Sequence, residues 1–208
     1  MRRRSFLAPA LVLAATLAGT PPTSAAHAGT RSTMPPPTHV AVSDFLFDPT
    51  EVAIGAGQTV VFDLVGPSHH TVNDASGMDL YASGSIGPGD PSFSVTFPAA
   101  GRYLFTCIPH PWMGGRVTIP MRVRRLSGAP RPTFRVGWAA SDAALGFVYD
   151  VQIFRPGRQW ANWQTGVTVR AVSFTPTAGP GTYRFRARMR GLAGGQALWS
   201  AAAQLHVG

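Results

Sequence analysis

The chain has 208 residues, of which 45% are hydrophobic and 13% are charged, and it contains 23 Gly and 19 Pro. This balance indicates packed globular structure, and so much Gly and Pro excludes a protein built from long helices. The formal charge is +9, and a single Cys excludes an intrachain disulfide. We therefore expect an all-β chain of one or two domains with many turns.

The N-terminus has the three parts of a secretory signal peptide. Three arginines at positions 2–4 precede an apolar run over residues 8–19, and Ala26-His-Ala28 forms a small-x-small cleavage site. The apolar run is shorter than the roughly 20 residues that span a bilayer. We predict a signal peptide over residues 1–28 and an extended, proline-containing linker over residues 29–38.

This signal implies export, to the periplasm, the cell envelope or the extracellular space. Residues Arg3-Arg-Ser-Phe-Leu7 resemble the twin-arginine export motif, although Arg rather than Ser or Thr precedes the pair. An ordinary basic segment and a twin-arginine signal both remain open.

Residues 39–120 form the first module, where apolar and polar residues alternate as in half-buried strands. The predicted strands cover 40–47 with a kink at Ser43-Asp44, 52–54, 59–65, 93–97, 103–107 and 116–119. Turns rich in Gly and Pro separate them at the spacing of a β-sandwich. Loops at one end of such a scaffold can present ligands for a metal.

Three metal ligands of different kinds lie within seven positions of one predicted loop: Cys107, His110 and Met113. Thiolate, imidazole and thioether together suit copper, because sulfur favours Cu(I) while imidazole holds Cu(II). A trigonal site with a weak axial thioether needs a second His from another loop. His70, which follows the predicted strand 59–65, can supply it.

These two segments resemble the copper-site signature of the cupredoxins, the family of plastocyanin, pseudoazurin and amicyanin. The spacing of two residues between Cys107 and His110, and of two more before Met113, is most similar to amicyanin. The resemblance covers about residues 40–120 and implies a Greek-key β-sandwich with one type 1 copper ion. It implies His70, Cys107 and His110 as trigonal ligands and Met113 as the axial ligand.

The resemblance also implies how electrons enter and leave. They would pass through the exposed edge of His110, and Pro109, Pro111 and Trp112 would surround it with an apolar docking patch. In the family an Asn often follows the upstream His and ties the two ligand loops together. Here Thr71 stands in that place, and its hydroxyl can make one such bond but not two.

The remaining histidines are predicted not to bind metal. His69 neighbours His70, but side chains alternate along an extended segment, so we expect it at the surface. His39 and His206 have no metal-like neighbours and are expected to be ordinary strand residues.

Residues 121–208 form the second module, which differs sharply in charge. The first module has seven acids and two Arg, whereas the second has two acids and twelve Arg. The second module resembles a fibronectin type III domain, with Trp138 as the early core Trp and Tyr183 as the corner Tyr of strand F. In that resemblance, Trp199-Ser200 leads into the last strand. The predicted role of this module is spacing or adhesion.

One strand of the second module carries an arginine stripe: Arg184, Arg186, Arg188 and Arg190 alternate with apolar residues. Period-two alternation places all four on one outer face. Two interpretations remain open. One is a solvated face that adds nothing to folding, and the other is a docking surface for an anionic partner, such as a cell-envelope polymer.

Together these features predict an exported blue copper protein that carries single electrons between redox partners. The alternative is a protein that buffers or delivers copper without redox turnover. A copper enzyme is not expected, because Thr106 and Ile108 flank Cys107 where multicopper oxidases have His. A nucleic-acid partner is not expected either, because the chain is predicted to be exported.

Overall fold

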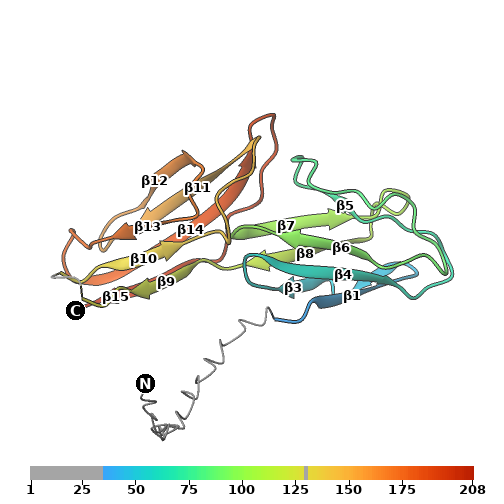
Figure 1. The fold of residues 1–208 in the computed structure, drawn as a ribbon, viewed down its shortest axis with the longest axis horizontal. Helices are drawn as coiled ribbons and strands as arrows, with labels where there is room; N and C mark the ends of the chain where they lie inside the picture. Colours follow the sequence, from blue (N-terminus) through green and yellow to red (C-terminus); the bar gives the residue numbers. More distant parts are fainter. Residues whose placement is uncertain (1–34, 129–130) are drawn as a thin grey trace, which may run out of the picture. The chain divides into compact units, whose positions relative to one another are not determined.

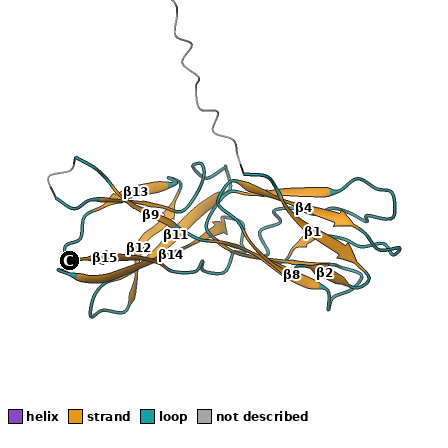
Figure 2. Ribbon diagram, turned by 90° about the horizontal axis from the view of Figure 1, so that it is seen from below, coloured by secondary structure: helices purple, strands orange, loops and turns teal. Residues whose placement is uncertain are grey.

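The structure is a computed structural model that describes residues 35–128 and 131–208. The predicted signal peptide and most of the predicted linker lie outside the described residues. Strands and connecting loops make up the described part, as Figure 1 and Figure 2 show. No helix there is long and apolar enough to cross a bilayer. The all-β prediction is confirmed.

The first module forms two four-stranded sheets, in the orders β2-β1-β4-β6 and β3-β8-β7-β5. The strands are β1 (Thr38–Ser43), β2 (Leu46–Asp48), β3 (Glu51–Ala53), β4 (Gln58–Leu64), β5 (Asn73–Asp74), β6 (Phe93–Phe97), β7 (Gly101–Thr106) and β8 (Gly114–Ile119). β1 runs parallel to β4 and β3 parallel to β8, whereas the other pairs are antiparallel. Every predicted strand region of this module therefore contains a strand.

Alternation along these strands builds the core. Val40 and Val42 are fully buried on one face of β1, as the spacing of their side chains requires. The buried rings of Phe47, Phe62 and Phe105 meet edge to face, with centroids 4.9 to 6.2 Å apart. Each such ring contributes about 1.5–3 kcal/mol by leaving water. The sheets thus give the loops between them a stiff support.

The prediction of one kinked strand at Ser43-Asp44 is wrong, because the structure has a turn between two strands there. The chain reverses there, and β1 and β2 form an antiparallel pair in which Ser43 lies opposite Leu46. The Asp44 carboxylate holds the turn, because it accepts hydrogen bonds from the backbone N–H and the hydroxyl of Ser68. These contacts join residues 24 positions apart, so local alternation could not reveal the turn.

The short strand β5 was missed as well. Asn73 and Asp74 pair with Thr106 and Phe105 of β7. Two polar residues carry no apolar alternation, so their extended conformation comes from the neighbouring strand and not from local sequence.

The second module contains a three-stranded sheet, β13-β10-β9, and a four-stranded sheet, β12-β11-β14-β15. The strands are β9 (Arg122–Arg125), β10 (Phe134–Gly137), β11 (Phe147–Phe154), β12 (Trp160–Val167), β13 (Ala171–Phe174), β14 (Gly181–Gly191) and β15 (Ala203–Val207). All their pairings are antiparallel. Trp138, Tyr183 and Phe185 are buried within this module.

The arginine stripe on β14 is not an isolated row of charges. The guanidinium of Arg186 lies 4.4 Å from the ring centre of Trp160, and that of Arg188 lies 4.4 Å from Trp199. Arg184 similarly covers Phe154 at 5.5 Å. Such cation–π contacts stabilise by about 0.5–1 kcal/mol at exposed sites. The interpretation that the stripe adds nothing to folding is therefore wrong.

A buried carboxylate completes this arrangement. Oδ2 of Asp150 lies 3.4 Å from Nε of Arg188 and 3.2 Å from Nε of Arg190. Burial raises the pKa of Asp150, but hydrogen bonds from Arg190 and Gly166 and the two positive charges outweigh it and lower the pKa overall. The ionised form of Asp150 therefore stabilises the fold above the pH at which the unfolded chain's Asp titrates, and this stabilisation is lost as pH falls through the lowered folded pKa.

Candidate metal centre

Three of the four predicted ligands converge at one end of the first module. His70 follows β4 and is held in an isolated bridge with Ile86, through backbone hydrogen bonds of 2.9 and 2.8 Å. Cys107 comes directly after β7, and His110 lies in the loop that joins β7 to β8. Hydrogen-bonded strands or bridges therefore hold both ligand loops in position.

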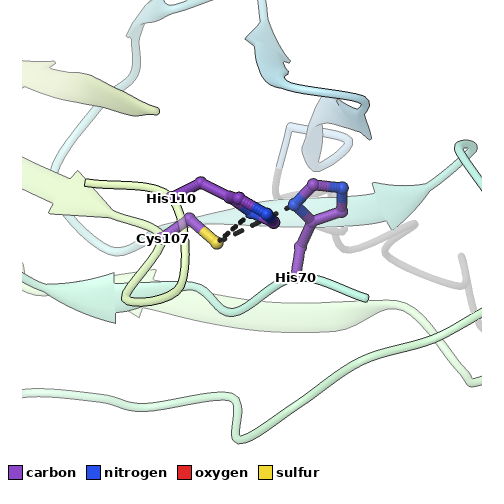
Figure 3. A group of neighbouring side chains, drawn as sticks. All are labelled: His70, Cys107 and His110. Atoms are coloured by element: carbon purple, nitrogen blue, oxygen red, sulfur yellow. Dashed lines mark hydrogen bonds between the residues drawn. The ribbon is translucent and has the colours of Figure 1, made fainter. Parts of the chain in front are cut away.

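The donor atoms face one another. Figure 3 shows the Cys107 sulfur directed at both rings. Sγ of Cys107 lies 3.8 Å from Nδ1 of His70 and 3.5 Å from Nδ1 of His110. All three donor atoms lie within 4.8 Å of one another. A metal bound at about 2.0–2.3 Å in a trigonal plane needs donors about 3.5–4 Å apart. The spacing from sulfur to each ring nitrogen meets that requirement.

A carboxylate fixes the orientation of His70. Oδ1 of Asp44 lies 2.9 Å from Nε2 of this buried ring. The hydrogen bond with His70, together with those from Ser68, lowers the pKa of Asp44. An ionised carboxylate can only accept, so Nε2 is the donor in this contact, and Nδ1, which faces Cys107, is the ring atom left to bind a metal. Asp44 was not identified from the sequence, because it lies 26 positions before His70.

We expect Asp44→Ala to weaken copper binding about 10–100-fold, because a ligand His that loses such a partner is no longer held in position. Competition with a chelator measures the affinity, and the NMR signals of the His70 ring in the metal-free protein report its orientation. Asp63→Ala is the matched control, since Asp63 also pairs with a histidine, His39, at 2.6 Å. Equal copper affinity in both variants would contradict the role of Asp44.

Thr71 ties the two ligand loops together. Its hydroxyl oxygen accepts a hydrogen bond of 2.9 Å from the backbone N–H of Ile108. Its own backbone N–H donates to Sγ of Cys107 at 3.3 Å. The same hydroxyl donates to Sγ of Cys107 at 3.9 Å, so the expectation of one side-chain bond at this position is wrong: the hydroxyl accepts one bond and donates another. The backbone donor adds a further link, and its positive hydrogen, directed at the sulfur, would stabilise negative charge there.

Met113 lies at the base of the loop, directly before β8, and is buried. Its backbone N–H donates to the carbonyl of His110 at 2.8 Å, and its carbonyl accepts from the N–H of Cys107 at 3.0 Å. These bonds close a tight turn between Cys107 and Met113. The spacings of two residues between Cys107 and His110, and between His110 and Met113, therefore fit this closed turn.

The outer side of the site is aromatic. His110 is partly exposed, and Trp112 beside it has 70% of its surface exposed, so Trp112 is not part of the core. The ring of Phe45, which is 48% exposed, lies 4.6 Å from the ring of His110. Phe45 was assigned to a strand because the chain reversal at Asp44 was not foreseen. The neighbouring Asp44, a residue type common in turns, was the only local sign that the chain reverses before Phe45.

The three other histidines in the described part of the chain lie outside this group. The side chain of His69 is exposed and lies near the hydroxyl of Ser85. His39 pairs with Asp63, and His206 contacts the hydroxyl of Thr182 at 3.0 Å.

The chemistry of the donor set selects among metals. A buried thiol and two imidazole nitrogens, with a thioether residue on the same loop, offer both soft and borderline ligands. Oxygen-seeking ions such as Mg²⁺ and Ca²⁺ find no carboxylate directed into this group. The cluster of His70, Cys107, His110 and Met113 fits a single type 1 copper ion.

Comparisons with known proteins cover the same part of the chain. Residues 37–120 match the family of copper-binding proteins described as the plastocyanin/azurin family. Amicyanin-alpha from Methylorubrum extorquens is 32% identical over 116 residues, which are 53% of this chain and 98% of that protein.

Part of this chain is also similar to solved structures. Amicyanin from Paracoccus versutus is 27% identical, with 43% of this chain and 86% of that chain covered and a TM-score of 0.37. Plastocyanin from Dryopteris crassirhizoma is 27% identical, with 40% and 100% covered and a TM-score of 0.35. A purple cupredoxin from Nitrosopumilus maritimus is 22% identical, with 40% and 99% covered and a TM-score of 0.37.

Proposed function

This chain belongs to the plastocyanin/azurin family of copper-binding proteins, and from that premise we propose that it carries single electrons between redox partners. The ligands in this proposal are His70, Cys107 and His110, with Met113 as the axial ligand. The convergence of one sulfur and two ring nitrogens within 4.8 Å, next to a partly exposed His110, is the observation that carries it. When bound, copper supplies a one-electron couple between Cu(I) and Cu(II).

The surrounding residues hold this ligand set still. Asp44 fixes one ring, Thr71 links the loops, and the bonds at Met113 close the turn. Since none of these contacts depends on the charge of a metal, the ligands keep their places in both oxidation states. Little reorganisation then accompanies the gain or loss of an electron.

We place the docking surface for redox partners at His110 and Trp112. The exposed rings of Phe45 and Trp112 lie 4.6 and 5.6 Å from this ring, and Ile108, two residues before His110, is exposed as well. Exposed aromatic residues are the side chains that most often anchor transient interfaces. Electrons would cross at the edge of His110, where the distance from the ligand set to a partner is shortest.

The test is the rate of electron exchange of the copper-loaded full chain, measured by voltammetry and by NMR line broadening in mixtures of the two oxidation states. We expect reversible exchange, slowed about tenfold or more in Trp112→Ser because a buried anchor of the encounter complex is lost. Leu145→Ser removes a fully exposed apolar residue far along the sequence and should leave the rate unchanged.

Absence of reversible exchange, combined with rapid transfer of copper to a chelator, would overturn the electron carrier in favour of copper buffering or delivery. We do not assign an enzymatic activity to the chain. Export to the periplasm, cell envelope or extracellular space remains part of the proposal and rests on the sequence of residues 1–28.

We also propose that the second module is a fibronectin type III-like domain. Its sheets of three and four antiparallel strands support this assignment, as does a corner bond in which the hydroxyl of Tyr183 donates to the carbonyl of Gly179 at 2.9 Å. Trp138, the expected early core residue, is 1% exposed. The domain boundary at residues 120 and 121 belongs to this proposal.

A further inference from the structure

A second group of arginines, separate from the stripe on β14, lies on the outer face of the sheet β13-β10-β9. Arg122 and Arg124 project from β9 and Arg135 from β10, while Val123, Phe134 and Val136 between them face the core. Arg170 precedes β13. We call this group the arginine depression, because the four side chains line one hollow of ≈ 580 Å³.

Strand pairing forces these charges together. Arg124 and Arg135 are direct partners in the antiparallel register of β9 and β10. Directly opposite side chains have Cβ atoms about 4.5–5.5 Å apart, and like charges in such a pair destabilise a sheet. Arg122 lies two residues from Arg124 on the same face, about 6.5–7 Å along the strand. Repulsion between these arginines therefore lowers the stability of the sheet here.

Small residues form the floor of the hollow. Gly137 lies opposite Arg122 in the register, where any other residue would place a side chain between the arginines. An added Cβ there would be 3.7 Å from the Cβ of Ala171, in ordinary contact, so no close packing demands the glycine. Ala139, Ala140 and Ala171 add further small side chains, and Leu126 completes the lining. Because most of these side chains are small, the space between the arginines is open to a ligand.

Acidic side chains in this protein do not neutralise the group. All nine acids of the chain lie in the described ranges, and none forms an ion pair with Arg122, Arg124, Arg135 or Arg170 in the described structure. Asp142 accepts only the backbone N–H of Arg170, at 2.9 Å. The guanidinium of Arg170 is steadied by the carbonyl of Ala140 at 3.1 Å.

The arginine stripe on β14 differs in this respect. Asp150, Gln152 and aromatic rings occupy its guanidinium groups. The predicted anionic partner at Arg184, Arg186, Arg188 and Arg190 stays untested. The arginine depression has the greater capacity for a ligand, because its charges have no such partners.

We propose that the arginine depression binds a soluble anion with several phosphate groups, such as an oligophosphate. The planar guanidinium fork matches phosphate oxygens two at a time. A ligand with several negative charges in a small volume can offset all four arginines, whereas a single carboxylate offsets one. The hollow also favours a compact soluble ligand over a flat membrane surface, which would meet only its rim.

Calorimetric titration of the full chain with tripolyphosphate tests this proposal. We expect one binding site per chain and affinity that falls with added salt. In Arg124→Gln/Arg135→Gln we expect the affinity to fall about tenfold or more, because two charge-assisted sets of hydrogen bonds are lost. The variant Arg155→Gln/Arg158→Gln removes the same charge at the turn between β11 and β12, and it should bind like the parent protein.

Thermal unfolding checks that both variants fold, and Arg135→Gln alone provides a milder change that should weaken binding in part. Equal binding by the parent and the Arg124/Arg135 variant, or an equal loss in both double variants, would overturn the site. Citrate binding as tightly as tripolyphosphate would overturn the assignment to phosphate. Binding to phosphatidylglycerol vesicles without binding to tripolyphosphate would overturn the soluble ligand.

Discussion

Copper-loaded Cys107→Ser is expected to be colourless, while the parent protein shows an intense visible band. The band arises from charge transfer between a thiolate and Cu(II), and Cys107 is the only Cys in the chain. Its sulfur lies within 3.8 Å of both ring nitrogens, so a hydroxyl in its place leaves the two histidines without a soft third ligand. Visible absorption spectra of the two copper-loaded proteins measure the effect.

Cys107→Ser also distinguishes the loss of a copper ligand from a loss of folding stability. Ser is close to Cys in size, so the buried site keeps its packing and the metal-free variant should unfold at nearly the temperature of the metal-free parent. A colourless Cu(II) complex of the parent protein would refute the type 1 assignment. So would unchanged colour in Cys107→Ser, because no other thiolate exists to replace it.

The second large effect distinguishes the axial ligand from the ligands of the trigonal plane. We expect Met113→Leu to keep copper and colour but to raise the reduction potential, because a weak donor that favours Cu(II) is removed. We expect His70→Ala or His110→Ala to lose affinity by more than the roughly 10–100-fold that follows loss of a ligand's hydrogen-bond partner. Voltammetry and chelator competition measure the two quantities.

Met78→Leu is the control for the axial substitution, since Met78 is also a buried methionine of the first module. It should change neither potential nor affinity. If Met113→Leu abolished copper binding altogether, the division into three strong ligands and one weak ligand would be wrong. If His110→Ala kept full affinity, the trigonal set itself would need another member.

The position of Phe45 over His110 shows where reasoning from sequence stopped. Alternation correctly put Val40 and Val42 in the core, because period-two spacing is a local property of a strand. The reversal after Ser43 depends instead on Ser68 and His70, which donate to Asp44 from a distant loop. No pattern within a few residues encodes such a contact.

The arginines of the second module also show the difference between local alternation and contacts between distant segments. Alternation predicted that Arg184 to Arg190 share one outer face, and strand β14 has that alternation. Their stability depends on Trp160, Trp199 and Asp150, which neighbouring segments bring beside them. The register of β9 against β10 likewise decides that Arg124 and Arg135 meet, although eleven positions separate them in the chain.

The sequence by itself determined the all-β class and most strand positions, because alternation and turn residues act over a few positions. It also identified the copper ligands as candidates, because Cys107, His110 and Met113 belong to one short loop whose spacing is visible directly. Tertiary structure alone decided which atoms face the site, which carboxylate orients His70, and which arginines have no acidic partner among the described residues. Those outcomes depend on contacts between distant segments, and such contacts exist only after the sheets have paired.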